Sequence, residues 1–206
     1  MIKNIHLLFL FLCLVLVPSG MVVGSTSYHI GNSLTRNMSP AGLSAMAAQT
    51  EKDHQIGYHI RRGVELYYIW KVPDDIENET NSFGNYVNAL PSYEWDFVTF
   101  QPFYSVGSTL GRDQAAISGF IDLTLAGPSV LPIFYIYSAW PPLSDDYQAF
   151  WNQPIQNDQS QQTTHAREYF DHLYQNLLNQ FGTNIQLHLI PIGEVLYRLD
   201  KVFIQV

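Results

Sequence analysis

The stretch SYHIGNSLTRNMSP, residues 27–40, decides how the chain folds, because its character changes at one point. A short apolar run over 26–30 predicts a β-strand that ends at Gly31. Helix-compatible sequence follows, with Ser39 as a candidate N-cap and Pro40 suited to the first helical position. A strand followed directly by a helix is the first half of a βαβ unit.

The same alternation continues along the rest of the chain. Extended segments are predicted around His59 and over 64–70, 95–101, 130–137 and 185–190, and helices over 40–51, 81–90, 113–125 and 166–181 and after Pro191. The proline-containing segment 141–159 is predicted to be an ordered excursion outside the core. Strands alternating with helices predict right-handed βαβ crossovers and a mostly parallel sheet.

Composition limits the classes of protein to which the chain can belong. Its 206 residues suffice for one domain with a real core, and 47% hydrophobic with 14% charged residues is typical of a globular protein. The net charge is -8, and Arg61-Arg62 is the only adjacent basic pair. Nucleic acid is therefore not an expected partner, because binding phosphates needs a concentrated positive patch.

The N-terminus has the pattern of a secretion signal. Lys3 supplies a positive start, residues 7–17 form an apolar run, and Pro18 breaks it. We predict a signal peptide over 1–24, cut after Gly20 or Gly24, and a single domain over 25–206 that is exported to the periplasm or the exterior. An uncleaved N-terminal anchor is the alternative. No membrane span is expected once the signal has been removed.

Cysteine and metal chemistry are not expected in the mature protein. Cys13 is the only cysteine, and it lies within the predicted signal. Disulfides, a thiolate nucleophile and cysteine metal sites are thus absent from the predicted mature chain. No grouping of His, Asp and Glu has metal-ligand spacing, so we predict neither a metal nor another cofactor.

Two polar residues directly follow strands that the sequence predicts. Ser33 follows the first strand and Gln101 follows the strand over 95–101. In parallel sheets, ligands bind beyond the carboxyl ends of the strands, so both residues are expected at the functional rim. Ser33 either stabilises a turn or acts as a nucleophile, and its place at this rim favours the nucleophile.

Three segments resemble one enzyme family. GNSLT (31–35) resembles the first block of the SGNH, or GDSL-like, hydrolases, with Asn in place of the usual Asp. WDFVTFQPF (95–103) resembles the third block of bacterial branches whose strand ends in Gln, and LIPIGEVLYRLD (189–200) resembles the segment before their last block. The resemblance covers most of residues 26–200. It implies a flavodoxin-like three-layer α/β sandwich with a mostly parallel five-stranded sheet.

The resemblance also implies an activity and roles for particular residues. The protein is expected to be a secreted serine hydrolase that cleaves ester bonds, including acyl or acetyl esters on carbohydrate. Ser33 looks like the nucleophile, and the Ser33 N–H, the Gly63 N–H and the Gln101 amide look like the oxyanion donors. Asn32 is expected to support the active-site loop.

The catalytic base of that family is missing from the sequence. The family places it in a late Asp-x-x-His block, and no Asp in this chain has His three residues later. One interpretation is that the chain stops before this block and that its last helix is incomplete. The other is natural loss of the base, which leaves a non-catalytic exported glycan-binding protein on the same fold.

The other histidines and two tryptophans also have expected places relative to the site. His165, near the start of the helix over 166–181, is the internal candidate for a replacement base. His29 is expected to point into or across the sheet and His188 to be packed, whereas His172 is expected at the surface. Trp140 and Trp151 flank the excursion and are candidates for contacts with a carbohydrate.

Overall fold

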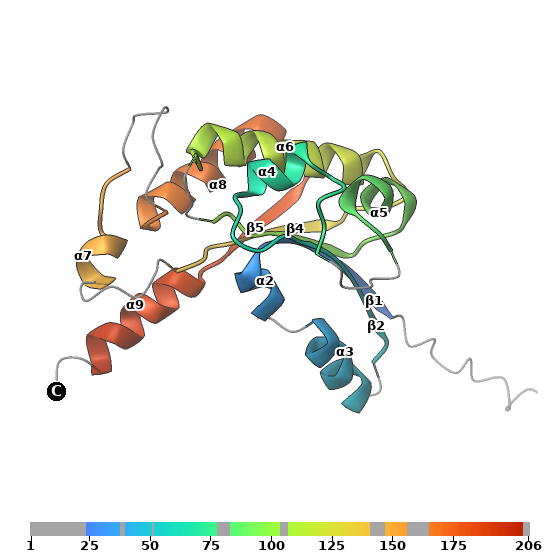
Figure 1. Cartoon of the computed structure of the whole chain (residues 1–206), viewed down its shortest axis with the longest axis horizontal. Coiled ribbons are helices and arrows are strands. Elements are labelled where there is room, and N and C mark those ends of the chain that lie inside the picture. Colours follow the sequence, from blue (N-terminus) through green and yellow to red (C-terminus); the bar gives the residue numbers. More distant parts are fainter. Residues whose placement is uncertain are drawn as a thin grey trace, which may run out of the picture.

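The computed structural model describes residues 24–37, 40–50, 52–77, 83–103, 107–140, 147–155 and 165–203. Within them, one parallel sheet has the strand order β2-β1-β3-β4-β5 (Figure 1). Its strands are β1 (Ser25–Gly31), β2 (His54–Ile60), β3 (Phe97–Phe100), β4 (Ile133–Tyr137) and β5 (Gln186–Ile190). This is the flavodoxin-like order, and the α/β class with a parallel five-stranded sheet is confirmed.

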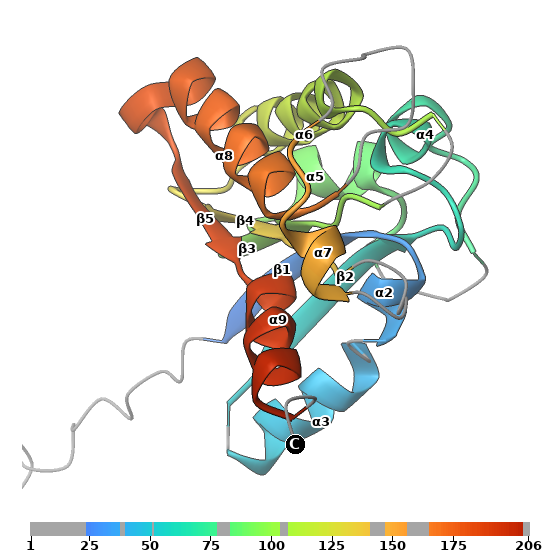
Figure 2. The ribbon, with the colours of Figure 1, turned by 90° about the vertical axis from the view of Figure 1, so that its left-hand side faces the viewer.

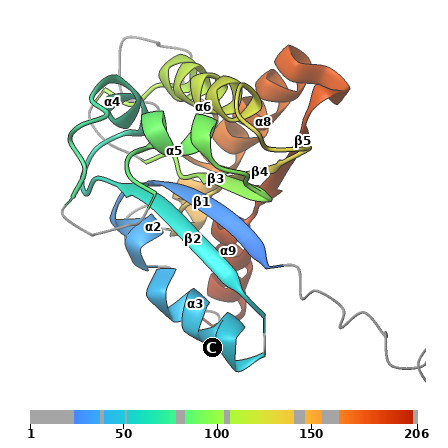
Figure 3. The same ribbon diagram turned by 90° about the vertical axis from the view of Figure 1, so that its right-hand side faces the viewer.

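Helices lie on both sides of the sheet, which makes three layers (Figures 1 and 3). One layer contains α4 (Leu66–Lys71), α5 (Tyr86–Ser92), α6 (Leu110–Leu125) and α8 (Arg167–Phe181). The opposite side carries α2 (Ser33–Asn37), α3 (Pro40–Gln49) and α9 (Ile192–Phe203). The short helix α7 (Tyr147–Trp151) lies beside α9, and η1 (Gly182–Asn184) joins α8 to β5. None of the helices in these segments is long and apolar enough to cross a membrane.

The main core lies between the sheet and the α4–α8 layer. Alternate residues of the central strands point into it, and Phe100 of β3 stacks against both Phe120 of α6 and Phe134 of β4. All three rings are completely buried. Burying a side chain of this kind stabilises the fold by about 1.5–3 kcal/mol, so this layer holds the strands in register.

One predicted extended segment is helical, so that prediction is wrong. Residues 64–70 were expected to be extended, but α4 begins at Leu66 and the neighbouring strand β2 lies earlier. Aromatic and β-branched residues favour strands, which explains the error. In the fold, Leu66 and Ile69 lie three residues apart and are each 1% exposed, so one helical face packs into the core beside α6. This packing overrides the local propensity.

The ends of several helices agree with the sequence. Pro40 begins α3, although its candidate N-cap Ser39 lies outside the described residues, as do residues 1–23 of the predicted signal. The Gly182 N–H donates to the Leu178 carbonyl and ends α8 as predicted. Within the excursion over 141–159, α7 forms, and residues 141–146 and 156–159 lie outside the described residues.

Two glycines of α6 are expected to respond in opposite ways to alanine. A Cβ on Gly119 would lie 2.4 Å from Trp70 Cζ2, and the Trp70 ring is held between Tyr86 and Phe120. Gly119→Ala should therefore lower the free energy of unfolding by about 1–3 kcal/mol through overpacking. A Cβ on Gly111 would meet no atom within 4 Å, so Gly111→Ala should raise it by about 0.5–1 kcal/mol.

Urea unfolding of both glycine variants, followed by circular dichroism, checks this expectation. Gly111→Ala is the matched control, because it makes the same chemical change in the same helix. Equal shifts of the two variants would contradict the close approach of Trp70 to α6.

Candidate functional site

The carboxyl ends of the strands form a rim that faces the viewer in Figure 2. Ser33 is the first residue of α2 and lies just beyond β1, and Gln101 lies just beyond the adjacent strand β3. The Asn32 N–H donates a hydrogen bond of 3.1 Å to Gln101 Oε1. The corner that carries Ser33 and the side chain of Gln101 are therefore neighbours, as the sequence predicts.

The Gln101 amide ties this corner together and is 2% exposed. Its Oε1 also accepts from Thr35 Oγ1 at 3.2 Å, and its Nε2 donates to the Pro102 carbonyl at 2.6 Å. A backbone N–H can only donate and a carbonyl can only accept, so these partners set the orientation of the amide. The acceptor end of Gln101 thus faces the Ser33 corner. The NH2 group, which was predicted to be an oxyanion donor, bonds to Pro102.

Gly31 makes this arrangement possible. A Cβ at Gly31 would lie 2.1 Å from Thr35 Oγ1 and 2.8 Å from Gln101 Cβ. Real Cβ atoms do not approach other atoms so closely, so the residue before the corner has to be glycine for α2 to turn back onto β3. The first glycine of the GNSLT stretch is thus explained by packing.

Asn32 supplies a side-chain donor that the sequence interpretation missed. Its Oδ1 accepts from the Leu34 N–H at 3.0 Å, and its carbonyl accepts from the Arg36 N–H at 3.0 Å. Its Nδ2 is fully buried, with no hydrogen-bond partner among the described residues. An unpaired buried donor costs about 1–3 kcal/mol. At this corner, the uncommitted amide donor belongs to Asn32, which was assigned only a supporting role.

Gly63 lies in the exposed loop after β2. Its φ of +73° is in the left-handed region that favours glycine, and a Cβ there would meet nothing within 4 Å. The Arg61 N–H donates to the Gly31 carbonyl at 3.0 Å, which joins this loop to the Ser33 corner. Turn geometry therefore accounts for Gly63, and its oxyanion role stays a prediction.

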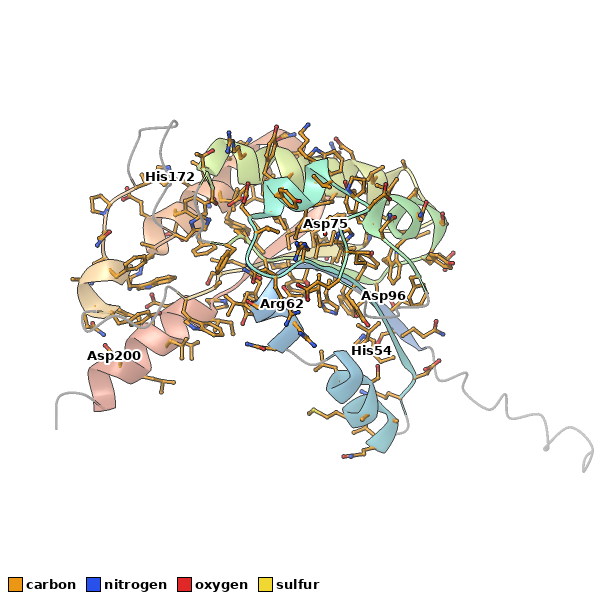
Figure 4. The ribbon with its side chains drawn as sticks, viewed as in Figure 1. His54, Arg62, Asp75, Asp96, His172 and Asp200 are labelled. Carbon is orange, nitrogen blue, oxygen red and sulfur yellow. The ribbon has the colours of Figure 1, made fainter. Side chains whose placement is uncertain are left out.

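The adjacent arginines of this loop are paired with carboxylates. Arg61 Nε lies 2.9 Å from Asp75 Oδ1, and Arg62 Nε lies 2.6 Å from Glu77 Oε2. The side chains labelled in Figure 4 include Arg62 and Asp75. The Arg61 guanidinium, followed by the Tyr68 hydroxyl, lowers the pKa of Asp75. The one basic pair of the sequence is thus neutralised locally.

Ser33 has no base beside it in the part of the chain that the structure describes. Its side chain is half-buried, and no hydrogen bond of its hydroxyl is found there. Among the described residues, two other serines contact histidine rings: Ser27 contacts both His29 and His54, and Ser108 contacts His165. The residues for a serine–histidine pair are present, but not at the predicted nucleophile.

His165, the internal candidate for a base, belongs to a buried cluster between α6 and α8. Asp113 Oδ2 is contacted by His165 Nε2 at 3.1 Å, by Ser108 Oγ at 3.3 Å and by the Tyr169 hydroxyl. All four side chains are at most 3% exposed. Burial, followed by the charge of Asp113, raises the pKa of Tyr169 well above its ordinary value.

This cluster has the residue types of a serine hydrolase triad but not its geometry. In a triad, the serine bonds to one ring nitrogen and the aspartate to the other. Here His165 Nε2 lies 3.2 Å from Ser108 Oγ and also contacts Asp113, so one nitrogen faces both groups. The complete burial of Ser108 and Asp113 adds to the mismatch. The arrangement suits a structural link between the starts of two helices.

A second polar chain crosses the sheet face opposite the main core. His29 Nδ1 lies 2.8 Å from Thr99 Oγ1 and its Nε2 lies 2.9 Å from Ser27 Oγ, which in turn lies 3.0 Å from His54 Nε2. Burial, with a smaller effect of His54, lowers the pKa of His29 to about 4. His29 is therefore a neutral link between strands at pH 7, and it points across the sheet face as predicted.

The remaining histidines lie in three different settings. His59 is fully buried against the Tyr86 ring, and burial lowers its pKa to about 4 despite the opposing effect of Asp75. His172 is exposed on α8, in the helix layer opposite α2 (Figure 4). His188 was expected to be packed but is exposed, because β5 is an edge strand and this side chain lies outside the core.

The two tryptophans that flank the excursion are the predicted carbohydrate contacts, and no metal site is predicted. Trp151 is 2% exposed and Trp140 is half-buried against the core, and their contacts with a carbohydrate stay a prediction. Across the described segments, no three His, Cys, Asp or Glu side chains gather closely enough to hold a metal ion.

Comparisons with known proteins support the fold. No protein-family model matches the chain, and no curated protein matches it. Among solved structures, the chain is similar to a DUF4886 family protein from Bacteroides uniformis ATCC 8492, with a TM-score of 0.54. The match has 16% sequence identity and covers 82% of this chain and 67% of that chain. At this identity the likeness shows a shared fold alone.

Proposed function

We propose that this protein hydrolyses carboxylic esters with the Ser33 hydroxyl as its nucleophile. The observation that carries the proposal is the corner after β1, where Ser33 lies half-buried at the rim beside the unpaired Asn32 amide donor. The resemblance of residues 31–35, 95–103 and 189–200 to the SGNH hydrolases supports the same chemistry. The substrate class that this resemblance suggests is acetyl esters of carbohydrates, and the protein would act on them outside the cell.

The reaction would have two steps. Ser33 Oγ bonds to the carbonyl carbon of the ester, its proton passes to a base, and the alcohol leaves with a proton as the acyl–serine forms. Water then attacks the acyl–serine and releases the acid and the free serine. Each tetrahedral intermediate carries an oxyanion, for which the Ser33 N–H and the Asn32 Nδ2 are donors that the corner could offer.

This proposal requires a base from outside the described residues, and that requirement gives a test. We expect added imidazole to raise the rate at which the protein hydrolyses phenyl acetate, after subtraction of the rate with imidazole alone. In Ser33→Ala the protein-dependent rate should fall by at least about tenfold, because the nucleophile is gone. Ser92→Ala, on the exposed end of α5, is the matched control and should keep the wild-type rate.

Mass spectrometry of the protein after incubation with phenyl acetate gives a second readout. An acetyl group is expected on the peptide that contains Ser33. An undiminished protein-dependent rate in Ser33→Ala, or acetylation at other residues only, would contradict the proposal.

Ligand binding without turnover is the second candidate function. It is favoured by one observation: no histidine in the described part of the chain contacts Ser33. Binding of an acetylated oligosaccharide that is unchanged in Ser33→Ala, with no hydrolysis in the presence of imidazole, would favour this function over the first.

A further inference from the structure

A cavity of about 320 Å³ lies at the other end of the rim, beside β4 and β5. Figure 2 shows the elements that surround it, α7, α8, α9 and the end of β5, on the side that faces the viewer. Its walls are mostly carbon, from Trp151, Phe170, Leu189 and Pro191. Since a water molecule occupies about 30 Å³ in the liquid, the cavity has room for roughly ten non-hydrogen atoms.

One polar side chain in the wall has no partner. Ser138 follows β4 and is 1% exposed, and its Oγ makes no hydrogen bond within the described residues. Its backbone is held on both sides, because its N–H donates to the Ile190 carbonyl and its carbonyl accepts from the Gly193 N–H, each at 3.0 Å. A buried hydroxyl without a partner is unfavourable, and a ligand in the cavity would supply one.

Three charged side chains line the cavity: Arg167 and Glu194 are paired with each other, whereas Asp171 is exposed and has no ion pair among the described residues. Glu194 Oε2 accepts from Arg167 Nη2 at 2.7 Å and from Trp151 Nε1 at 3.0 Å, and Glu194 Oε1 accepts from Arg198 Nε at 3.0 Å. Arg167 also donates to Asn152 Oδ1 and lies over the Tyr197 ring. A charged ligand would have to compete with the Arg167–Glu194 pair or lie at the exposed Asp171, where water and salt screen its charge, so the site favours an uncharged ligand.

The wall on the α7 side is held in place by a close contact. A Cβ on Gly193 would lie 2.1 Å from Trp151 Cη2, so the indole ring packs directly against the α9 backbone. Two contacts fix the orientation of the Trp151 ring. Its Nε1 donates to Glu194, and its centroid lies 6.2 Å from the centroid of the Phe170 ring. The cavity is therefore formed before any ligand arrives, as is usual for small-molecule sites.

We propose that this cavity binds a small, uncharged and mostly apolar molecule whose single hydroxyl or carbonyl group bonds to Ser138 Oγ. The carbon walls accept the apolar part, and the unpaired Ser138 hydroxyl orients the polar group. The proposal does not rest on ester chemistry at Ser33, because the cavity lies two strands away from β1 in the sheet.

The test uses three probes of equal chain length at pH 7: 1-hexanol, hexanoate and hexylamine. Thermal unfolding of the full chain is followed by circular dichroism at increasing probe concentration. We expect 1-hexanol to raise Tm, because a ligand that binds only the folded state stabilises it. The charged probes should raise Tm much less. A larger shift with hexanoate or hexylamine than with 1-hexanol would overturn the proposal.

Variants connect the effect to the cavity. Ser138→Ala removes the unpaired hydroxyl, so its Tm without ligand should equal or exceed that of the wild type, while 1-hexanol should bind about tenfold more weakly. Leu189→Phe fills the cavity and should abolish the shift. Ser118→Ala is the matched control. Ser118 lies on α6, away from the cavity, and its hydroxyl already donates to Gln180 Oε1 of α8 at 3.0 Å. An unchanged 1-hexanol effect in both cavity variants would overturn the proposal.

Discussion

Asp113→Ala is expected to lower the free energy of unfolding by about 3–5 kcal/mol, because it removes the shared acceptor of a buried polar cluster. His165, Ser108 and Tyr169 all contact Asp113 Oδ2, and none of the four side chains is more than 3% exposed. In the variant these groups would stay buried without their acceptor. The substitution also weakens the packing of α6 against α8, since Asp113 joins the start of one helix to the start of the other.

Chemical denaturation at pH 7 measures the effect of Asp113→Ala. Asp122→Ala, an exposed position on the same helix, is the matched control and should change stability by less than about 0.5 kcal/mol. Tyr169→Phe, which removes one donor and leaves the acceptor in place, should cost about 1–3 kcal/mol. A loss below 1 kcal/mol in Asp113→Ala would mean that the cluster does not hold the two helices together.

Acid is expected to destabilise the protein between pH 6.5 and about pH 4. Burial lowers the pKa of both His29 and His59 from 6.5 to about 4. Between these values the unfolded chain binds protons that the folded chain does not, so stability falls as the pH falls. Each histidine contributes about 3 kcal/mol to the total loss, of which about 2 kcal/mol is reached by pH 5.

Urea unfolding at pH 7 and pH 5 checks the acid effect. His59→Phe keeps an aromatic ring against Tyr86 but cannot be protonated, so it should remove about half of the loss between the two pH values. His172→Gln, on the exposed surface of α8, is the matched control and should keep the full loss. An unchanged pH dependence in His59→Phe would show that this ring is not buried in its neutral form.

Protonation of the Glu194 carboxylate is expected to lower the stability of the fold only at lower pH. Burial of Glu194 opposes ionisation, but hydrogen bonds from Trp151, Arg167 and Arg198 outweigh it and lower its pKa to about 2. The stability that this carboxylate contributes is therefore complete above pH 4.5 and is lost as the pH falls toward 2. The loss of stability caused by the histidines and the loss caused by Glu194 thus fall in different pH ranges and can be measured separately.

The sequence by itself determined the α/β class, the parallel sheet and the placing of Ser33 and Gln101 at one rim. These features follow from local patterns. A strand such as β3 is a short run of apolar and aromatic residues, and a helix such as α8 carries its apolar residues at 3.6-residue spacing and ends at Gly182. Strands that alternate with helices permit few topologies, because crossovers are right-handed.

Only the tertiary structure decided the geometry of the candidate sites. The helix α4 forms where the local pattern favoured a strand, because Leu66 and Ile69 pack into the core beside α6. The orientation of the Gln101 amide depends on Asn32 and Thr35, 66 or more residues away in the chain. The Ser138 hydroxyl is likewise left buried and unpaired only because β5, α7 and α9 pack around it. Such contacts join distant residues, and no local sequence pattern carries that information.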